Sequence, residues 1–367
     1  MKISLRSILI ILTAGIVAGA GVFWLGLINI GASTGHWAIT DWVLHTAMRR
    51  SVQFRADATP PEDFPSAAMI RRGAGHYEIG CAPCHGSPAA PRGAVVREMT
   101  PEPPDLSGRI DLWSPADLFW IVKHGVKLTG MPAWPARSRD DEVWSMVAFL
   151  TEMPQMNQEE YRVLAYGDGP MTVARQREFL AETAPALIDC ARCHGMDGSG
   201  DVNGAFPRLD IQDAAYLADS LDAYASGRRF SGIMQEAVAG LDEKTRNELA
   251  KYYAGTSSNA ESESPKDISS DLLQRGGTIA MHGIPEDNIA ACAGCHDQPG
   301  TAARPGFPRL SGQYRAYLET QLHLFAADIE RGGGAFAHLM REATHALEGE
   351  DIKAVAAWYA SRSTPSE

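Results

Sequence analysis

The sequence contains six cysteines, which form three pairs with two residues between the members of each pair. A histidine follows the second cysteine every time, so the strings read CAPCH, CARCH and CAGCH. The residues are Cys81, Cys84 and His85; Cys190, Cys193 and His194; and Cys292, Cys295 and His296. The C-x-x-C-H string is typical of covalent haem c attachment, because two thiols on one turn reach the porphyrin vinyl groups and the next residue points its imidazole at the iron.

Two other kinds of cysteine site fit this pattern poorly. A zinc site of four cysteines uses two pairs, which would strand the third pair and leave the three histidines without a reason. A thioredoxin-like redox motif needs a βαβ setting that none of the strings has. All six cysteines are used by the strings, and none remains as a nucleophile. The sequence therefore predicts three covalently attached haem c groups.

Length and charge narrow the class of protein further. The 367 residues suffice for two or three modest domains. Lys and Arg number 33 against 45 for Asp and Glu, and the formal net charge of −12 argues against a nucleic-acid partner. The sequence has no Gly-rich phosphate loop and no second catalytic constellation.

The N-terminal region carries a long stretch without charge, from Ser7 to Gly35, behind Lys2 and Arg6. Its length fits a transmembrane helix better than the short apolar region of a signal peptide. A signal peptide cut near Ala18 to Ala20 is the alternative. Because the positive residues lie on the N-terminal side, we expect residues 1–35 to anchor the chain in the cytoplasmic membrane, with the rest on the periplasmic side.

Residues 36–65 are expected to form an interfacial helix and a linker. Trp37 and Trp42 occur there among arginines, a mixture that suits a helix lying along the membrane surface. A contact with a membrane partner and a plain connecting helix are the alternatives. Three prolines end this region: Pro60, Pro61 and Pro65.

Three repeated units follow, and each contains one C-x-x-C-H string. We place them at residues 66–155, 165–255 and 268–362. Units two and three align well, since FPRL occurs at 206–209 and again at 307–310. The polar residues 256–267 between them read as a linker that would let unit three move independently.

Unit one follows a different variant of the repeat. Ser114 is predicted to be the N-cap of a helix that contains Leu118 and Phe119. A final amphipathic helix is predicted from its apolar residues Val143, Trp144, Val147 and Leu150.

All three units resemble class I cytochrome c domains, and units two and three are similar to the tandem domains of di-haem cytochromes that serve bacterial respiratory oxidases. The resemblance rests on the C-x-x-C-H strings and covers roughly residues 66–362. It implies an all-α fold with three tandem cytochrome c domains after one N-terminal transmembrane helix. It also implies that each histidine is one axial iron ligand and that a methionine sulfur is the other.

Carried onto this sequence, the resemblance implies Met131 as the sixth ligand in unit one, because Gly-Met-Pro is the ligand loop of the family; His124 is a rival. Met234 and Met340 are the candidates in units two and three, although neither stands in a Gly-Met-Pro string. In unit three, ligation by two histidines stays open, with His338 or His345 in place of the methionine.

The resemblance also implies a proline carbonyl that accepts a hydrogen bond from each iron-binding imidazole. Pro207 and Pro308 stand at the required distance in units two and three. In unit one, either Pro103 or Pro104 would serve from a longer loop.

Iron atoms closed by methionine leave no position for a substrate, so the resemblance implies an electron carrier and not an enzyme in its own right. One function is membrane-anchored transfer from a quinol-oxidising complex to a terminal haem-copper oxidase, either free or bound to one of these complexes. The alternative is the cytochrome subunit of a membrane-bound dehydrogenase that delivers electrons to quinone. The N-terminal anchor favours the first function, and a haem enzyme such as a peroxidase is the third and weakest reading.

The number of haem groups gives a direct test of the motif analysis. The mature chain should carry three covalently bound haems, because each C-x-x-C-H string is complete. The intact mass after acid–acetone extraction should exceed that of the apoprotein by three haem masses. A gain of two haem masses or fewer would show that at least one string is not used.

Overall fold

The computed structural model describes residues 4–108, 110, 112–167, 186–201, 203–296, 306–327 and 329–363. Over these ranges all regular elements are helices, and strand pairing is limited to isolated bridges. The expected all-α fold is confirmed. The predicted opening of unit two, and part of its boundary with unit one, fall within residues 168–185, which lie outside the described residues.

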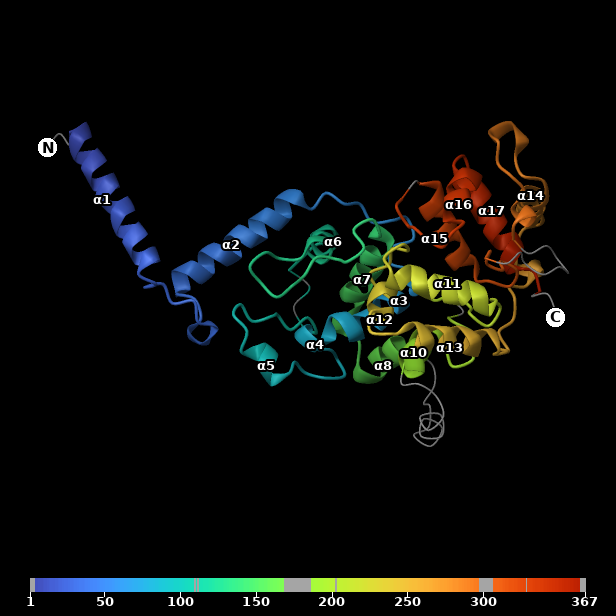
Figure 1. Ribbon diagram of the computed structural model, residues 1–367, viewed down its shortest axis with the longest axis horizontal. Helices are drawn as coiled ribbons and strands as arrows, with labels where there is room; N and C mark the ends of the chain where they lie inside the picture. Colours follow the sequence, from blue (N-terminus) through green and yellow to red (C-terminus); the bar gives the residue numbers. More distant parts are fainter. Residues whose placement is uncertain are drawn as a thin grey trace.

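The N-terminal arm consists of two helices (Figure 1). Helix α1 (Leu5–Trp24) projects away from the main body, and α2 (Ala38–Arg55) contacts a helix of unit one. Helix α1 has 20 residues and none of them is buried. At 1.5 Å per residue, such a helix is about 30 Å long, which matches the hydrocarbon core of a bilayer. Among the described helices, only α1 is long and apolar enough to cross a membrane, a description that a signal sequence would also meet.

Unit one is built around the crossing of its first and last long helices. Its helices are α3 (Ala67–Gly80), α4 (Ala82–His85), α5 (Ala94–Arg97), α6 (Pro115–His124), α7 (Asp140–Glu152) and α8 (Gln158–Tyr166). A Cβ on Gly73 of α3 would lie 2.3 Å from the Ser145 carbonyl oxygen of α7, so only glycine permits this close approach. As predicted, Ser114 caps α6, where it forms a capping box with Asp117, and the apolar residues of α7 are buried.

Units two and three are smaller helical bodies of similar order. Unit two contains α10 (Ala186–His194), α11 (Ala214–Ala225), α12 (Met234–Val238) and α13 (Glu243–Ala254). Unit three contains α14 (Ser270–His282), α15 (Arg315–Ala326), α16 (Ala337–Thr344) and α17 (Gly349–Ala360). Gly276 of α14 repeats the glycine crossing of unit one, since its Cβ would lie 2.0 Å from the Ala354 carbonyl oxygen of α17. Each unit has its own hydrophobic cluster.

The repeated FPRL segments of units two and three meet at a reciprocal interface. The backbone N–H of Arg208 donates to Gln313 Oε1 at 2.9 Å, and Gln313 Nε2 donates to the Arg208 carbonyl at 3.0 Å. The same pair of bonds joins Arg309 and Gln212, at 2.9 and 2.8 Å. Both glutamines are buried, and each amide uses its donor and its acceptor in this contact. Each unit therefore supplies the partner for the other unit's FPRL backbone.

The side chain of Arg208 fastens the predicted linker to this interface. Arg208 forms a buried ion pair with Asp210 at 2.6 Å and donates to the Ala260 carbonyl at 3.1 Å. Further along, the Glu263 N–H donates to the Ala360 carbonyl of unit three at 3.1 Å. Residues 256–267 are thus bonded to both units, which argues against the independent movement of unit three. Independent movement was expected because residues 256–267 are polar, but a polar composition does not reveal which polar groups form hydrogen bonds.

Loss of this ion pair should be costly. We expect Arg208→Ala to lower the free energy of unfolding of units two and three by about 3–5 kcal/mol, because it leaves a buried carboxylate without its partner. Arg228→Ala is the matched control, since Arg228 pairs with Asp219 at 3.6 Å on the surface, with about half of its side chain exposed; that loss should be within about 1 kcal/mol. Urea denaturation measures both, and equal effects would refute the structural role of Arg208.

Candidate haem sites

Each C-x-x-C-H string includes a helical turn, and in unit two this turn is the last one of α10 (Ala186–His194). In unit one, Cys81 stands at the start of α4 and His85 at its end; in unit three, Cys292 opens a 3-10 turn, Cys292–Gly294. In units one and two a glycine in the left-handed region follows the histidine, with φ of +70° at Gly86 and +74° at Gly195. A residue with a side chain would be strained there. These glycines let the chain leave the turn directly after the histidine.

Each histidine of these strings has its Nδ1 atom against a proline carbonyl. The distances are 2.9 Å from His85 to Pro104, 3.3 Å from His194 to Pro207 and 2.9 Å from His296 to Pro308. A carbonyl oxygen only accepts, so Nδ1 carries the proton and donates. In a neutral imidazole with this tautomer, the Nε2 atom holds the lone pair that binds iron.

The proline contacts bear out the expectations for units two and three and decide between two candidates in unit one. Pro104 is the partner of His85. The neighbouring carbonyl of Pro103 accepts instead from the Arg92 guanidinium. The sequence left this choice open because adjacent prolines place their carbonyls on different sides of the loop.

Burial keeps several side chains of the strings uncharged. Burial lowers the pKa of His194 to about 4 and also lowers the pKa of His85, so both rings are neutral near pH 7. Burial raises the pKa of Cys81 to about 12 and that of Cys292 to about 11, so these thiols stay protonated. All six cysteines are free, and no described residues form a group of three or more His, Cys, Asp or Glu that could hold a metal ion directly.

Unit three brings its two candidate axial ligands face to face. The Met340 sulfur lies 3.4 Å from Nε2 of His296, whose other nitrogen is on Pro308. These two atoms are in direct contact, and they are the electron-pair donors that would move apart to bind a haem iron between them. The rival histidines lie elsewhere: His338 is exposed, and His345 places its Nδ1 2.9 Å from the Glu342 carbonyl of its own helix. Of the candidates for the sixth ligand of unit three, Met340 is thus the one that lies beside His296, and its role as a ligand stays a prediction.

The other two candidate methionines have backbone groups that are held by local hydrogen bonds. The Met131 N–H donates to Thr129 Oγ1 at 3.1 Å, and its carbonyl accepts from the Val126 N–H at 3.2 Å. Met234 is the first residue of α12 and donates its N–H to Ser231 Oγ at 3.0 Å. His124, the rival in unit one, is exposed at the end of α6. The roles of Met131 and Met234 as ligands stay predictions.

Sequence reasoning missed a buried contact between unit one and the second haem site. A Cβ on Gly75 of α3 would lie 3.4 Å from Cys193 Sγ. On the same helix, Arg71 forms an ion pair with Asp201 at 3.3 Å and donates to the Arg192 carbonyl at 3.1 Å. An arginine and a glycine on a predicted helix carry no pattern that identifies a neighbouring unit. The second haem site is therefore partly enclosed by unit one.

Comparison with known proteins finds one matching family model and several related sequences. The family described as "Cytochrome C oxidase, cbb3-type, subunit III" matches residues 68–150. The thiosulfate dehydrogenase electron acceptor of Stutzerimonas stutzeri (strain A1501) is 30% identical over 182 residues, which cover 48% of this chain and 80% of that protein. Cytochrome c4 of Pseudomonas aeruginosa is 30% identical, with coverage of 46% and 81%. The solved thiosulfate dehydrogenase (TsdBA) of Marichromatium purpuratum aligns with a TM-score of 0.43 at 30% identity, over 48% of this chain and 36% of that one.

The geometry of unit three predicts how its haem responds to substitution. Met340→Ala should convert one haem to a high-spin state and lower its reduction potential, because the sulfur opposite His296 is lost. His338→Ala and His345→Ala are the controls and should leave the absorption spectrum unchanged. If a histidine variant perturbs the spectrum and Met340→Ala does not, unit three has two histidine ligands.

Proposed function

This chain belongs to the cytochrome c family, and we propose that it is a membrane-anchored, three-haem electron carrier that passes electrons towards a terminal haem-copper oxidase. In this proposal each C-x-x-C-H string binds one haem c through its two thiols and its histidine. Met131, Met234 and Met340 are the sixth ligands in units one, two and three. The bound haem supplies one-electron oxidation and reduction, and the polypeptide sets its axial ligands and its surroundings.

The observation that carries this proposal is the approach of the Met340 sulfur to Nε2 of His296, at 3.4 Å. With both atoms bound to one iron, a substrate that needed the iron would first have to displace a ligand. An iron closed on both sides exchanges electrons through the edge of its porphyrin and has no place for bond-making chemistry. A methionine ligand also raises the reduction potential relative to a second histidine, which suits a donor to an oxidase.

The arrangement of the N-terminal arm supports anchoring. Helix α1 is uncharged from Ser7 onward, has no buried residue and points away from the units (Figure 1). Helix α2 buries only Val52 and leaves Trp37 and Trp42 exposed by 82% and 63%, which suits the headgroup region of a bilayer. We infer that α1 is retained in the mature protein and that the three units face the periplasm. Anchoring would keep the haems at high effective concentration beside a membrane complex.

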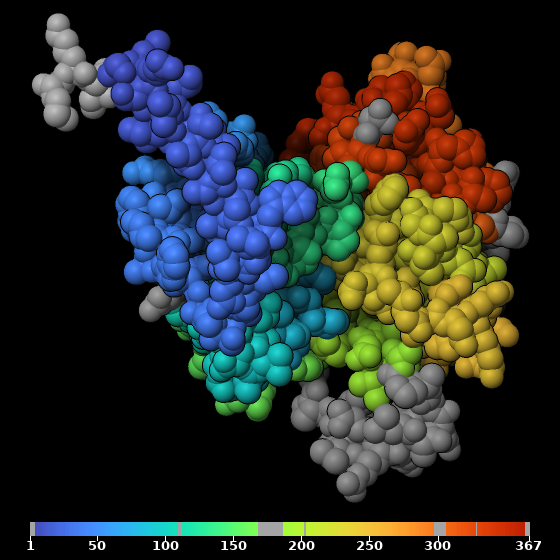
Figure 2. Space-filling model, turned by 60° about the vertical axis from the view of Figure 1, so that its left-hand side comes forward, coloured from blue at the N-terminus to red at the C-terminus, as the bar shows by residue number. Residues whose placement is uncertain are grey.

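The packing of the units supports a single conduit for electrons. Unit one contacts the second haem site through α3, and units two and three meet at their FPRL segments, directly beside the prolines that bind His194 and His296. Figure 2 shows the three units as one packed body. A fixed arrangement keeps the distances between neighbouring haems constant, and electron transfer depends steeply on that distance.

A second candidate function is favoured by the names of the relatives. Two of them are thiosulfate dehydrogenase electron acceptors. A chain of this kind would therefore also fit the role of electron acceptor for a dehydrogenase. In that case the protein would accept electrons from a catalytic partner and pass them to quinone or to a further carrier. The membrane anchor and the chemistry of the three haem sites would be the same in both cases.

Respiration of isolated membranes separates the two functions. Deletion of the protein should slow oxygen uptake with a quinol donor, and an artificial donor that feeds the oxidase directly should restore it. Complementation with the His338→Ala chain should restore quinol-driven uptake, whereas Met340→Ala should not, because only the latter removes an axial ligand. A loss confined to a single oxidisable substrate such as thiosulfate, with quinol respiration intact, would refute the oxidase proposal and favour the dehydrogenase.

A further inference from the structure

The segment that leads to Met234 lies between units one and three. Phe230 and Ile233 pack against the hydrophobic cluster of unit one. On its other side, the Phe230 N–H donates to the Arg331 carbonyl at 2.8 Å, and the Gly333 N–H donates to the Arg228 carbonyl at 2.9 Å. The ligand loop of unit two is therefore held by its neighbours and not by unit two alone.

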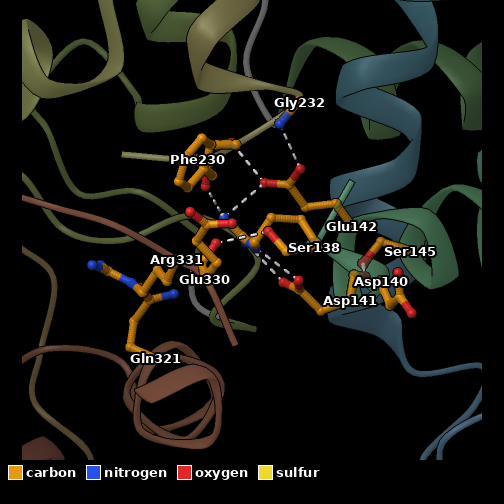
Figure 3. A network of polar contacts seen from close by, with 12 residues as sticks. Ser138, Asp140, Asp141, Glu142, Ser145, Phe230, Gly232, Gln321, Glu330 and Arg331 are labelled. Atoms are coloured by element: carbon orange, nitrogen blue, oxygen red, sulfur yellow. Dashed lines mark hydrogen bonds and ion pairs between the residues drawn. The ribbon is translucent and has the colours of Figure 1, made fainter. Parts of the chain in front are cut away.

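A carboxylate of unit one makes the most specific of these contacts. Glu142 of α7 is 3% exposed and points from unit one into the segment, as Figure 3 shows. Its Oε1 accepts from Ser231 Oγ at 2.6 Å, and its Oε2 accepts from the Gly232 N–H at 2.7 Å. Trp134 Nε1 donates to Oε2 at 3.2 Å, and Arg139 pairs with Oε1 at 3.1 Å. Burial raises the pKa of the Glu142 carboxyl, and the contacts from Arg139, Ser231 and Gly232 favour its charged form.

The contacts of Glu142 lead directly to the ligand candidates of two units. Ser231 Oγ, which donates to Glu142, accepts the N–H of Met234 at 3.0 Å. Trp134 lies three residues after Met131, and a Cβ on Gly232 would lie 2.4 Å from its Nε1. The indole therefore lies against the backbone two residues before Met234. One carboxylate thus joins the loop that carries Met131 to the loop that carries Met234.

The neighbours of Glu142 extend the junction to unit three. Arg139 donates to the Phe230 carbonyl at 2.8 Å and is itself held by Asp141 through two bonds of 2.8 Å. Ser138 Oγ donates to the Glu330 carbonyl at 2.7 Å, ten residues before Met340. Residues 138–142 of unit one therefore contact the segments that precede the candidate ligands of both other units (Figure 3).

We propose that Glu142 is a positioning residue for the second haem: it holds Ser231 and Gly232 so that Met234 stays on the iron. The inference rests on the proposed function, because it takes Met234 as the sixth ligand. Unit two then has a ligand loop whose stability depends on a side chain of unit one. Hydrogen bonds to the Glu142 carboxylate are stronger than those between neutral groups. Without them, Ser231 and Gly232 are held less firmly, and the methionine should leave the iron more readily.

The test follows the rate at which added imidazole replaces methionine on the ferric full-length protein. Each haem should give one kinetic phase of imidazole binding. In Met234→Ala the phase of the second haem should be complete at once, because no methionine has to leave, and this identifies that phase. In Glu142→Ala the same phase should be about tenfold faster than in the wild type, equal to about 1.4 kcal/mol, and the reduction potential of that haem should fall. The other two phases should not change. Glu142→Gln should lie closer to the wild type, because its amide oxygen still accepts from Gly232 or Ser231.

Two further variants make the result decisive. Asp140→Asn is the matched control, since Asp140 stands on the same helix but pairs with Lys123 within unit one at 2.5 Å; it should alter no phase. Ser231→Ala removes the link to Met234 without unpairing Arg139, and it decides the matter if Glu142→Ala fails to fold.

The outcomes distinguish this inference from the ligand assignment. If Met234→Ala affects one phase but Glu142→Ala and Ser231→Ala do not, the ligand assignment holds and the positioning role is refuted. Equal acceleration of all three phases, or an equal effect of Asp140→Asn, also refutes it. If Met234→Ala alters no phase, Met234 is not the ligand and both proposals are wrong for unit two.

Discussion

The hydrogen bond from each histidine Nδ1 to a proline carbonyl is the constraint on which the haem sites depend. It decides the tautomer of the ring, and so it decides that Nε2 holds the lone pair available to iron. In units two and three the accepting carbonyl belongs to the FPRL segment, whose next residue is held by a glutamine of the other unit. The orientation of each of these two imidazoles is therefore linked to the packing of the opposite unit. The orientation of the candidate ligands and the packing of units two and three therefore depend on each other.

The sequence revealed most of the chemistry and little of the assembly. The C-x-x-C-H strings identify their cysteines and histidines directly. The prolines of units two and three follow these histidines at a similar spacing in the sequence, so both features could be predicted. The cap at Ser114 and the buried face of α7 follow from local pattern. Met340 was named from the sequence, but the choice of Pro104 and the approach of Met340, in place of His338 or His345, to His296 needed coordinates, because both depend on how a loop folds back. Sequence patterns cannot show which distant loop a side chain will face.

Contacts between units were the larger omission, and they have a common physical reason. A glutamate such as Glu142, on a helix with acidic neighbours, reads as a solvent-facing residue, since most acidic side chains are exposed. Its burial becomes favourable only when donors from several parts of the chain converge on it, and those donors are a serine, a backbone amide, an indole and an arginine. The same applies to residues 256–267, where a polar composition suggested a free linker and the structure shows a bonded one. Polar contacts between residues far apart in the chain produce no periodic pattern in the local sequence.

The reciprocal glutamine contacts have a consequence for symmetry. Gln212 with Arg309 repeats Gln313 with Arg208, so the interface between units two and three has the form of an isologous contact, in which the same surface patch serves on both sides. A patch of this kind is complementary to itself as well as to its partner. Either unit, separated from the other, would present a glutamine and an FPRL backbone that fit a second copy of the same unit. Within one chain, covalent linkage keeps the two matching surfaces close together, so each is covered by the other.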